Sequence, residues 1–156
     1  PATRTRESKH SRGDMPRADG EGGAGRGGVP VGALSIGADG VLVAQAGNRI
    51  VELRDPTARA EVLAIRAAAE RLGSERLIDC DLYVTLEPCA MCAGAISFAR
   101  LRRLYYGAED PKGGAVDNGP RFFGQPTCHH APDVYGGLSE GPASTLLKQF
   151  FADRRS

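Results

Sequence analysis

The segment between residues 81 and 107 constrains the fold more than any other part of the chain. Residues 81–86 (D-L-Y-V-T-L) are typical of a strand, residues 87–100 are expected to form a helix, and residues 103–107 are typical of a second strand. Two strands joined by a helix of this length pair in parallel through a right-handed crossover. The sequence therefore predicts an α/β fold.

An antiparallel hairpin is expected ahead of this strand–helix–strand segment. Two apolar runs, 29–37 and 41–47, flank the dipeptide Asp39-Gly40, and Asp-Gly between apolar runs is a strong turn signal. Residues 48–54 are expected to form a connecting loop. The chain should therefore build a mixed sheet that begins with an antiparallel pair and continues with parallel strands.

Another helix is expected between the hairpin and residue 81. Asp55 can cap a helix, Pro56 suits its first position, and Gly73 is suited to end it. The apolar positions that repeat at helical spacing, and so are expected to face the core, are Val62, Ile65, Ala69 and Leu72.

The chain length and composition suit one folded domain. The chain has 156 residues, of which 41% are hydrophobic, enough for a core. Residues 1–28 are rich in glycine and arginine and poor in large apolar side chains, so we expect them to be disordered. Residues 29–156 are then the folded domain, with a long polar loop at 108–133 and a final helix at 142–155.

The charge and the apolar pattern narrow the choice of partners and compartment. The net charge is +1, so a nucleic-acid partner would have to meet a local basic patch rather than a global positive field. We find no apolar run long enough to span a membrane and no signal peptide, and we expect a cytoplasmic location. Without a secretory signal, the four cysteines favour metal or redox chemistry over disulfides.

Two of these cysteines form a Pro-Cys-x-x-Cys motif at the expected start of the second helix. Cys89 and Cys92 lie one turn apart, where unpaired backbone N–H groups and the helix dipole favour thiolates. Such a pair can bind zinc, can act as a thioredoxin-like redox pair, or can simply be buried. The motif by itself leaves these alternatives open.

Glu61 adds a carboxylate to the same region. It lies one turn into the first expected helix, between Ala60 and Val62. The amino-terminal ends of the two helices can face each other at one edge of the sheet, which would place Glu61 beside the thiolates. A carboxylate in that position can move protons during a metal-assisted hydrolysis.

The chain resembles the zinc-dependent nucleobase deaminases, whose signature is H-x-E followed by P-C-x-x-C. The closer resemblance is to bacterial tRNA-specific adenosine deaminases. The strings that carry it are V-P-V-G-A (29–33), G-N-R (47–49), D-P-T-A-R-A-E-V-L-A-I-R (55–66), L-Y-V-T-L-E-P-C-A-M-C-A-G-A-I (82–96), Y-G-A-E-D-P-K-G-G-A (106–115) and F-F-A-D-R-R (150–155).

The resemblance implies a fold, a reaction and a set of residue roles. The fold would be a three-layer, cytidine-deaminase-like α/β structure with a central mixed sheet of about five strands flanked by helices. The reaction would be hydrolytic deamination of the wobble adenosine of a tRNA to inosine, by a zinc-dependent homodimer that binds the anticodon arm. The implied roles are proton transfer by Glu61, zinc binding by Cys89 and Cys92, and substrate binding by Asn48, Asp110, Phe150, Phe151 and Arg154.

Arg59 departs from the family signature, because it occupies the position of the zinc-binding histidine. A guanidinium group has no lone pair to donate to a metal, and it keeps its charge. Two unit charges about 4 Å apart repel by roughly 4 kcal/mol at an effective dielectric constant of about 20. Zinc binding is therefore expected to be weakened or lost, and deamination with it.

Arg59 also keeps two other functions open. The chain could be a non-catalytic relative that binds tRNA or dimerises, or it could be a deaminase of a free base or nucleoside. The F-F-A-D-R-R and G-A-E-D-P-K strings favour tRNA over a free base.

Overall fold

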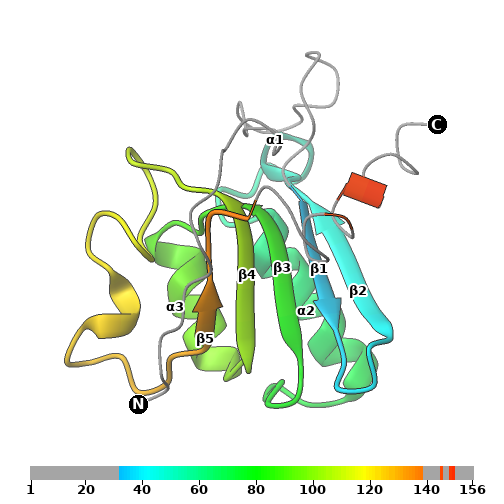
Figure 1. Cartoon of the computed structure of the whole chain (residues 1–156). Coiled ribbons are helices and arrows are strands. Elements are labelled where there is room, and N and C mark those ends of the chain that lie inside the picture. Colours follow the sequence, from blue (N-terminus) through cyan, green and yellow to red (C-terminus); the bar gives the residue numbers. More distant parts are fainter. Residues whose placement is uncertain (1–31, 139–144, 146–147, 150–156) are drawn as a thin grey trace.

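The protein folds around a five-stranded mixed sheet (Figure 1). The computed structural model describes residues 32–138, 145, 148 and 149. The strands are β1 (Gly32–Ile36), β2 (Leu42–Gly47), β3 (Asp81–Leu86), β4 (Arg103–Ala108) and β5 (Asp133–Tyr135), and their order in the sheet is β2-β1-β3-β4-β5. β1 is antiparallel to β2 and to β3, whereas β3, β4 and β5 run parallel. The predicted hairpin and parallel pair are both confirmed, and β5 is a strand that the sequence pattern does not indicate.

The two longer helices of the described residues lie on the same face of this sheet (Figure 1). The helices are α1 (Ile50–Leu53), α2 (Ala60–Leu72) and α3 (Ala90–Ala99), and a 3-10 turn, η3, spans Phe122–Gly124. α2 packs against β1 and β2, and α3 packs beside α2. The prediction that residues 48–54 form only a connecting loop is wrong, because this segment contains α1.

The buried residues of α2 are three alanines and Glu61, and of the predicted core residues Ile65 and Ala69 pack partly buried against the core. Ala60, Ala64 and Ala68 are fully buried, whereas the predicted core residue Leu72 is 50% exposed. Small side chains let the helix backbone approach the sheet closely, so the contact with the sheet follows the alanine stripe. Opposite it, alternate strand residues such as Leu82 and Leu104 face the helices.

α2 begins at Ala60, later than the predicted start at Asp55 and Pro56. Asp55 Oδ1 instead accepts hydrogen bonds from the Thr57 backbone N–H and hydroxyl, at 2.8 and 2.7 Å, and so stabilises a turn. The first turn of α2 is capped from a distant residue, because Asn48 Oδ1 accepts a hydrogen bond from the Ala60 N–H at 2.7 Å. Gly73 ends the helix in a left-handed conformation, as predicted.

The segment predicted to be a long polar loop is held by one buried carboxylate. Glu87, which is 3% exposed and follows β3, accepts backbone N–H groups from four residues. The four are Asp110, Val116, Asp117 and Asn118, at 2.8 to 3.0 Å. The Asn118 side-chain amide donates a fifth hydrogen bond, at 2.6 Å. The segment is therefore anchored at the start of the strand-to-helix connection.

The sheet face opposite α2 and α3 carries a ladder of tyrosines. Tyr83, Tyr105 and Tyr135 stack across β3, β4 and β5 with ring centroids 4.5 and 4.8 Å apart. Within the described part of the chain, no helix is long and apolar enough to cross a membrane.

Several predictions from the sequence concern residues outside the described part. These are the disordered segment 1–28, most of the final helix at 142–155, and the substrate-binding residues Phe150, Phe151 and Arg154. Residues 145, 148 and 149 are helical, in agreement with the expected final helix.

Candidate active site

The amino-terminal ends of α2 and α3 meet at one edge of the sheet. β2 and β3 are both antiparallel to β1 and therefore run in the same direction, so the helices that follow them start at the same edge. Arg59 is the residue before α2 and Cys89 the residue before α3, and both have extended backbones. This arrangement brings together Arg59, Glu61, Cys89 and Cys92, which we call the Arg–Glu–Cys cluster.

The two cysteines of the cluster have different protonation preferences. The pKa of Cys89 is lowered, chiefly because the Cys92 thiol stabilises the Cys89 thiolate. The backbone N–H groups of Cys92 and Met91 and the charge of Arg59 act in the same direction, whereas burial opposes the shift. The proton that Cys92 shares with Cys89, together with burial and the neighbouring Glu61, raises the pKa of Cys92. Cys89 is the N-cap residue of α3, but its side chain makes no regular capping hydrogen bond. The pair therefore favours one thiolate, at Cys89, and one thiol, at Cys92.

Glu61 is buried within the cluster and is only 3% exposed. Burial is the main cause that raises the pKa of its carboxyl group, and the Cys89 sulfur raises it further, whereas Arg59 and the Cys92 thiol oppose the shift. Its Oε1 atom has no hydrogen-bond partner among the described residues. A buried carboxyl group with a raised pKa and an open oxygen is suited to accept and release a proton.

The structure places the two predicted substrate-binding residues that it describes on either side of this edge. Asn48 lies beside the first turn of α2 through its hydrogen bond to Ala60. Asp110 lies in the segment anchored by Glu87, and its Oδ1 accepts hydrogen bonds from the N–H groups of Lys112 and Gly113, at 3.1 and 3.0 Å. Both side chains thus support local backbone.

Glu87 is a residue of this site that the sequence analysis missed. It follows a buried strand and precedes Pro88 and Cys89, and it fixes the segment that contains Asp110. The signal that could have identified it is a carboxylate directly after an apolar strand, since such a group needs several hydrogen-bond donors when it is buried.

The residues of the cluster do not fit a catalytic zinc ion, which takes three protein ligands. Cys89 and Cys92 supply two, and Arg59 has no lone pair for a metal. In the part of the chain that the structure describes, no group of three His, Cys, Asp or Glu residues is placed to hold a metal.

The two described histidines lie elsewhere. His130 Nε2 is 2.8 Å from the carbonyl oxygen of Leu101, beyond the carboxyl end of α3, whereas Cys89 precedes the amino end. α3 has 10 residues and so spans about 15 Å. His129 lines the same hollow as His130, so neither histidine replaces the missing ligand.

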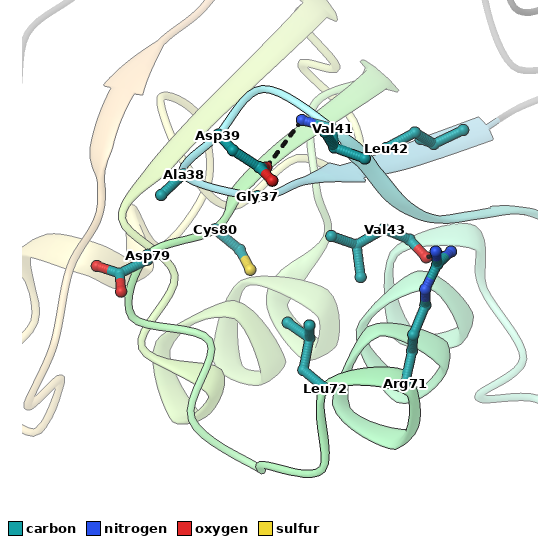
Figure 2. Close-up of a pocket in the computed structure, with 10 residues that line it drawn as sticks. All are labelled: Gly37, Ala38, Asp39, Val41, Leu42, Val43, Arg71, Leu72, Asp79 and Cys80. Carbon is teal, nitrogen blue, oxygen red and sulfur yellow. Dashed lines mark hydrogen bonds between the residues drawn. The ribbon is translucent and has the colours of Figure 1, made fainter.

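A separate hollow lies at the other end of α2 (Figure 2). It has a volume of about 510 Å³, and its wall includes Val43, Leu72 and Cys80. Arg71 closes one side by donating a hydrogen bond to the carbonyl oxygen of Val43 at 3.1 Å. This hollow is lined by none of the predicted site residues that lie in the described part of the chain.

Comparison with known proteins agrees with the resemblance that the sequence motifs indicate. The family model of the MafB19-like deaminases matches residues 17–152. A tRNA-specific adenosine deaminase of Agrobacterium fabrum is 64% identical over 127 residues, which cover 81% of this chain and 83% of that protein. One from Rickettsia typhi is 43% identical over 129 residues, covering 82% and 87% of the two chains.

A solved structure is similar as well. It comes from a study of A-to-I editing by tRNA:A34 deaminases at the wobble position of transfer RNA, and it has a TM-score of 0.70 and 65% sequence identity. The match covers 74% of this chain and 88% of that chain. The predicted cytidine-deaminase-like fold is confirmed by this likeness and by the mixed sheet. The chain therefore belongs to the deaminase family that includes the tRNA-specific adenosine deaminases.

Proposed function

We propose that this chain recognises the anticodon arm of a tRNA and that the reaction of its site is the hydrolytic deamination of the wobble adenosine to inosine. We further propose that Arg59, at the position of a zinc ligand, suppresses this reaction. The observation that carries the proposal is the buried Glu61 beside Cys89 and Cys92, in a chain 64% identical to a tRNA-specific adenosine deaminase. A tRNA substrate implies a cytoplasmic location.

The proposed proton transfer belongs to Glu61. The Glu61 carboxylate would take a proton from the attacking water as its oxygen bonds to C6 of the adenine. The carboxyl group, whose raised pKa favours the protonated form, would then give that proton to the amino group as the C–N bond breaks and ammonia leaves. Zinc dependence, which the family resemblance implies, requires a third ligand at position 59. A histidine there would complete a His-Cys-Cys set with Cys89 and Cys92.

Substrate binding is proposed for residues around this cluster. Asn48 would hydrogen-bond the flipped-out base, since its Oδ1 is occupied by Ala60 and its amide N–H groups are the donors that it can offer. Asp110 would lie near the ribose of the target nucleotide. Phe150, Phe151 and Arg154 would contact the anticodon arm.

The first prediction tests the reaction and its substrate. The Arg59→His variant, supplied with zinc, is expected to form inosine in an anticodon-arm RNA that has adenosine at the wobble position. The unaltered chain is expected to form none, because its site lacks a third metal ligand. Inosine is measured by nuclease digestion and chromatography of the RNA.

Free substrates provide the control for that experiment. The same variant should release no ammonia from adenine, adenosine, guanine or cytidine. Deamination of a free base or nucleoside, with the RNA left unchanged, would replace the tRNA proposal by a free-substrate deaminase. An unaltered chain as active as the variant would show that Arg59 does not suppress the reaction.

Arg59 itself favours a second candidate, in which the chain binds tRNA without altering it. Arg102 lies at the opposite end of the sheet, where the buried Asp81 engages it through two hydrogen bonds of 3.0 Å. Lys112 and Arg121 are exposed and remain available for phosphates. Binding of the RNA by both the unaltered chain and Arg59→His, with inosine from neither, would favour this candidate.

A homodimer is proposed on the exposed side of α3. Phe98 is 85% exposed and Met91 is 38% exposed, and a hollow of about 100 Å³ lined by Phe98 and Phe122 lies beside them. An apolar ring of this size at the surface is typical of an interface anchor.

The second prediction therefore concerns Phe98→Glu. A charge at an interface anchor is expected to weaken self-association by about 2 kcal/mol or more, or roughly 30-fold in the dimer dissociation constant. Analytical ultracentrifugation of both chains measures this change. Val41→Glu is the matched control, because Val41 is 54% exposed and precedes β2, the edge strand that packs against α2. A dimer that is equally stable in both variants would place the interface elsewhere.

A further inference from the structure

The Arg–Glu–Cys cluster gathers three acidic groups in a site that is largely closed to solvent. Glu61 and Cys92 are buried, and Cys89 and Arg59 are partly buried. Each of the three acidic groups interacts electrostatically with Arg59. The partly buried Cys89 favours the thiolate, and an anion that has lost hydration needs a neighbouring positive charge.

Arg59 is held so that its side chain can supply this charge. Its backbone N–H donates to the carbonyl oxygen of Thr57 at 2.8 Å, and its carbonyl oxygen accepts from the N–H of Leu63 at 2.9 Å. These bonds fix Arg59 at the start of α2, while Cys89 precedes α3 on the neighbouring helix. Its Nε atom is buried without a hydrogen-bond partner among the described residues, so the base of the guanidinium group is shielded from solvent.

A guanidinium group and a zinc ion exclude each other at this site. The guanidinium stays protonated and repels a divalent cation twice as strongly as a monovalent one at the same distance. It also takes the position from which a third ligand would come. Two cysteines alone would have to bind zinc against this repulsion.

We propose that the guanidinium of Arg59 replaces a metal ion as the positive charge of the Arg–Glu–Cys cluster, so that this chain folds and stays folded without zinc. The stability of the protein is then independent of metal, in contrast to a site in which metal binding contributes to folding. The proposal concerns the resting protein, and it holds whichever substrate the chain recognises.

Metal content and melting temperature test the proposal without any RNA. The unaltered chain and Arg59→His, Arg59→Gln and Arg59→Lys are produced in medium supplemented with zinc, and bound zinc is measured by plasma mass spectrometry. The unaltered chain should carry far less than one zinc ion per chain, and EDTA should leave its melting temperature unchanged. Arg59→His should carry close to one zinc ion per chain, and EDTA should lower its melting temperature by several degrees.

The other two variants separate charge from metal binding. Arg59→Gln removes the charge without adding a ligand, so it should melt below the unaltered chain and gain no zinc. Arg59→Lys keeps a positive charge and should melt above Arg59→Gln, again without zinc. If Arg59→His fails to fold, the zinc content and melting temperatures of the unaltered chain, Arg59→Gln and Arg59→Lys still test the proposal.

Two results would overturn the proposal. One is near-stoichiometric zinc, or an EDTA-sensitive melting temperature, in the unaltered chain. The other is an Arg59→Gln variant that melts as high as the unaltered chain, because the cluster would then need no positive charge. Zinc bound by Arg59→His without inosine formation would instead count against the proposed function and leave this inference standing.

Discussion

Replacing Glu61 by glutamine in the Arg59→His chain is expected to lower the rate of inosine formation by about 10²- to 10⁴-fold, the contribution that a positioned general acid or base typically makes. Glutamine has nearly the same shape and can still form hydrogen bonds, but it cannot hold and release a proton. Glu61 is only 3% exposed, and burial raises its pKa, so few water molecules can take over its role. Single-turnover kinetics on the anticodon-arm RNA measure the chemical step directly.

Controls show whether a lower rate reflects loss of proton transfer by Glu61 rather than loss of zinc, RNA binding or folding. The double variant should keep the zinc content of Arg59→His, and it should bind the RNA with unchanged affinity. Glu70→Gln, at an exposed position of the same helix, should leave the rate unchanged. A double variant that works within a few-fold of Arg59→His would remove Glu61 from the mechanism.

Replacing Glu87 by alanine is expected to destabilise the protein by about 3 to 5 kcal/mol, because a buried donor left without its acceptor costs roughly 1 to 3 kcal/mol and Glu87 serves several. Its carboxylate accepts four backbone N–H groups and one side-chain amide from the segment that includes Asp110. The hydrogen bonds from Val116 and Asp117 are buried, so these N–H groups would be left without a partner away from water, which is the unfavourable outcome for a hydrogen bond. The free energy of unfolding is measured by denaturant titration.

The structure around Glu87 adds a local signature to this prediction. A Cβ at Gly114 would lie 2.4 Å from the Glu87 carboxyl carbon, so the segment packs directly on this side chain. Backbone amides of 110–118 should therefore exchange hydrogen faster in Glu87→Ala, while those of α2 should change less. Glu75→Ala, at an exposed position, is the control and should be neutral. A variant as stable as this control would contradict the prediction.

Local patterns predicted the elements whose signal lies within a few residues. The strand–helix–strand segment, the hairpin and the end of α2 at Gly73 follow from apolar periodicity, from an Asp-Gly turn and from a glycine that accepts a left-handed conformation. β5 was missed because it has three residues, too few to show an alternating pattern. The start of α2 was misplaced because Asp55, a good capping residue, is used in a turn instead.

The sequence by itself determined the chemistry available to this protein: the thiols of Cys89 and Cys92, the carboxyl group of Glu61, and an arginine where a metal ligand was expected. These are properties of single residues and short motifs, and they hold before the chain folds. Only the tertiary structure decided which residues support them. Asn48 caps α2 from 12 positions away, and Glu87 anchors a segment 23 to 31 positions away. A buried polar group must find its partners wherever the fold brings them, so the choice of partner depends on long-range packing that no local pattern contains.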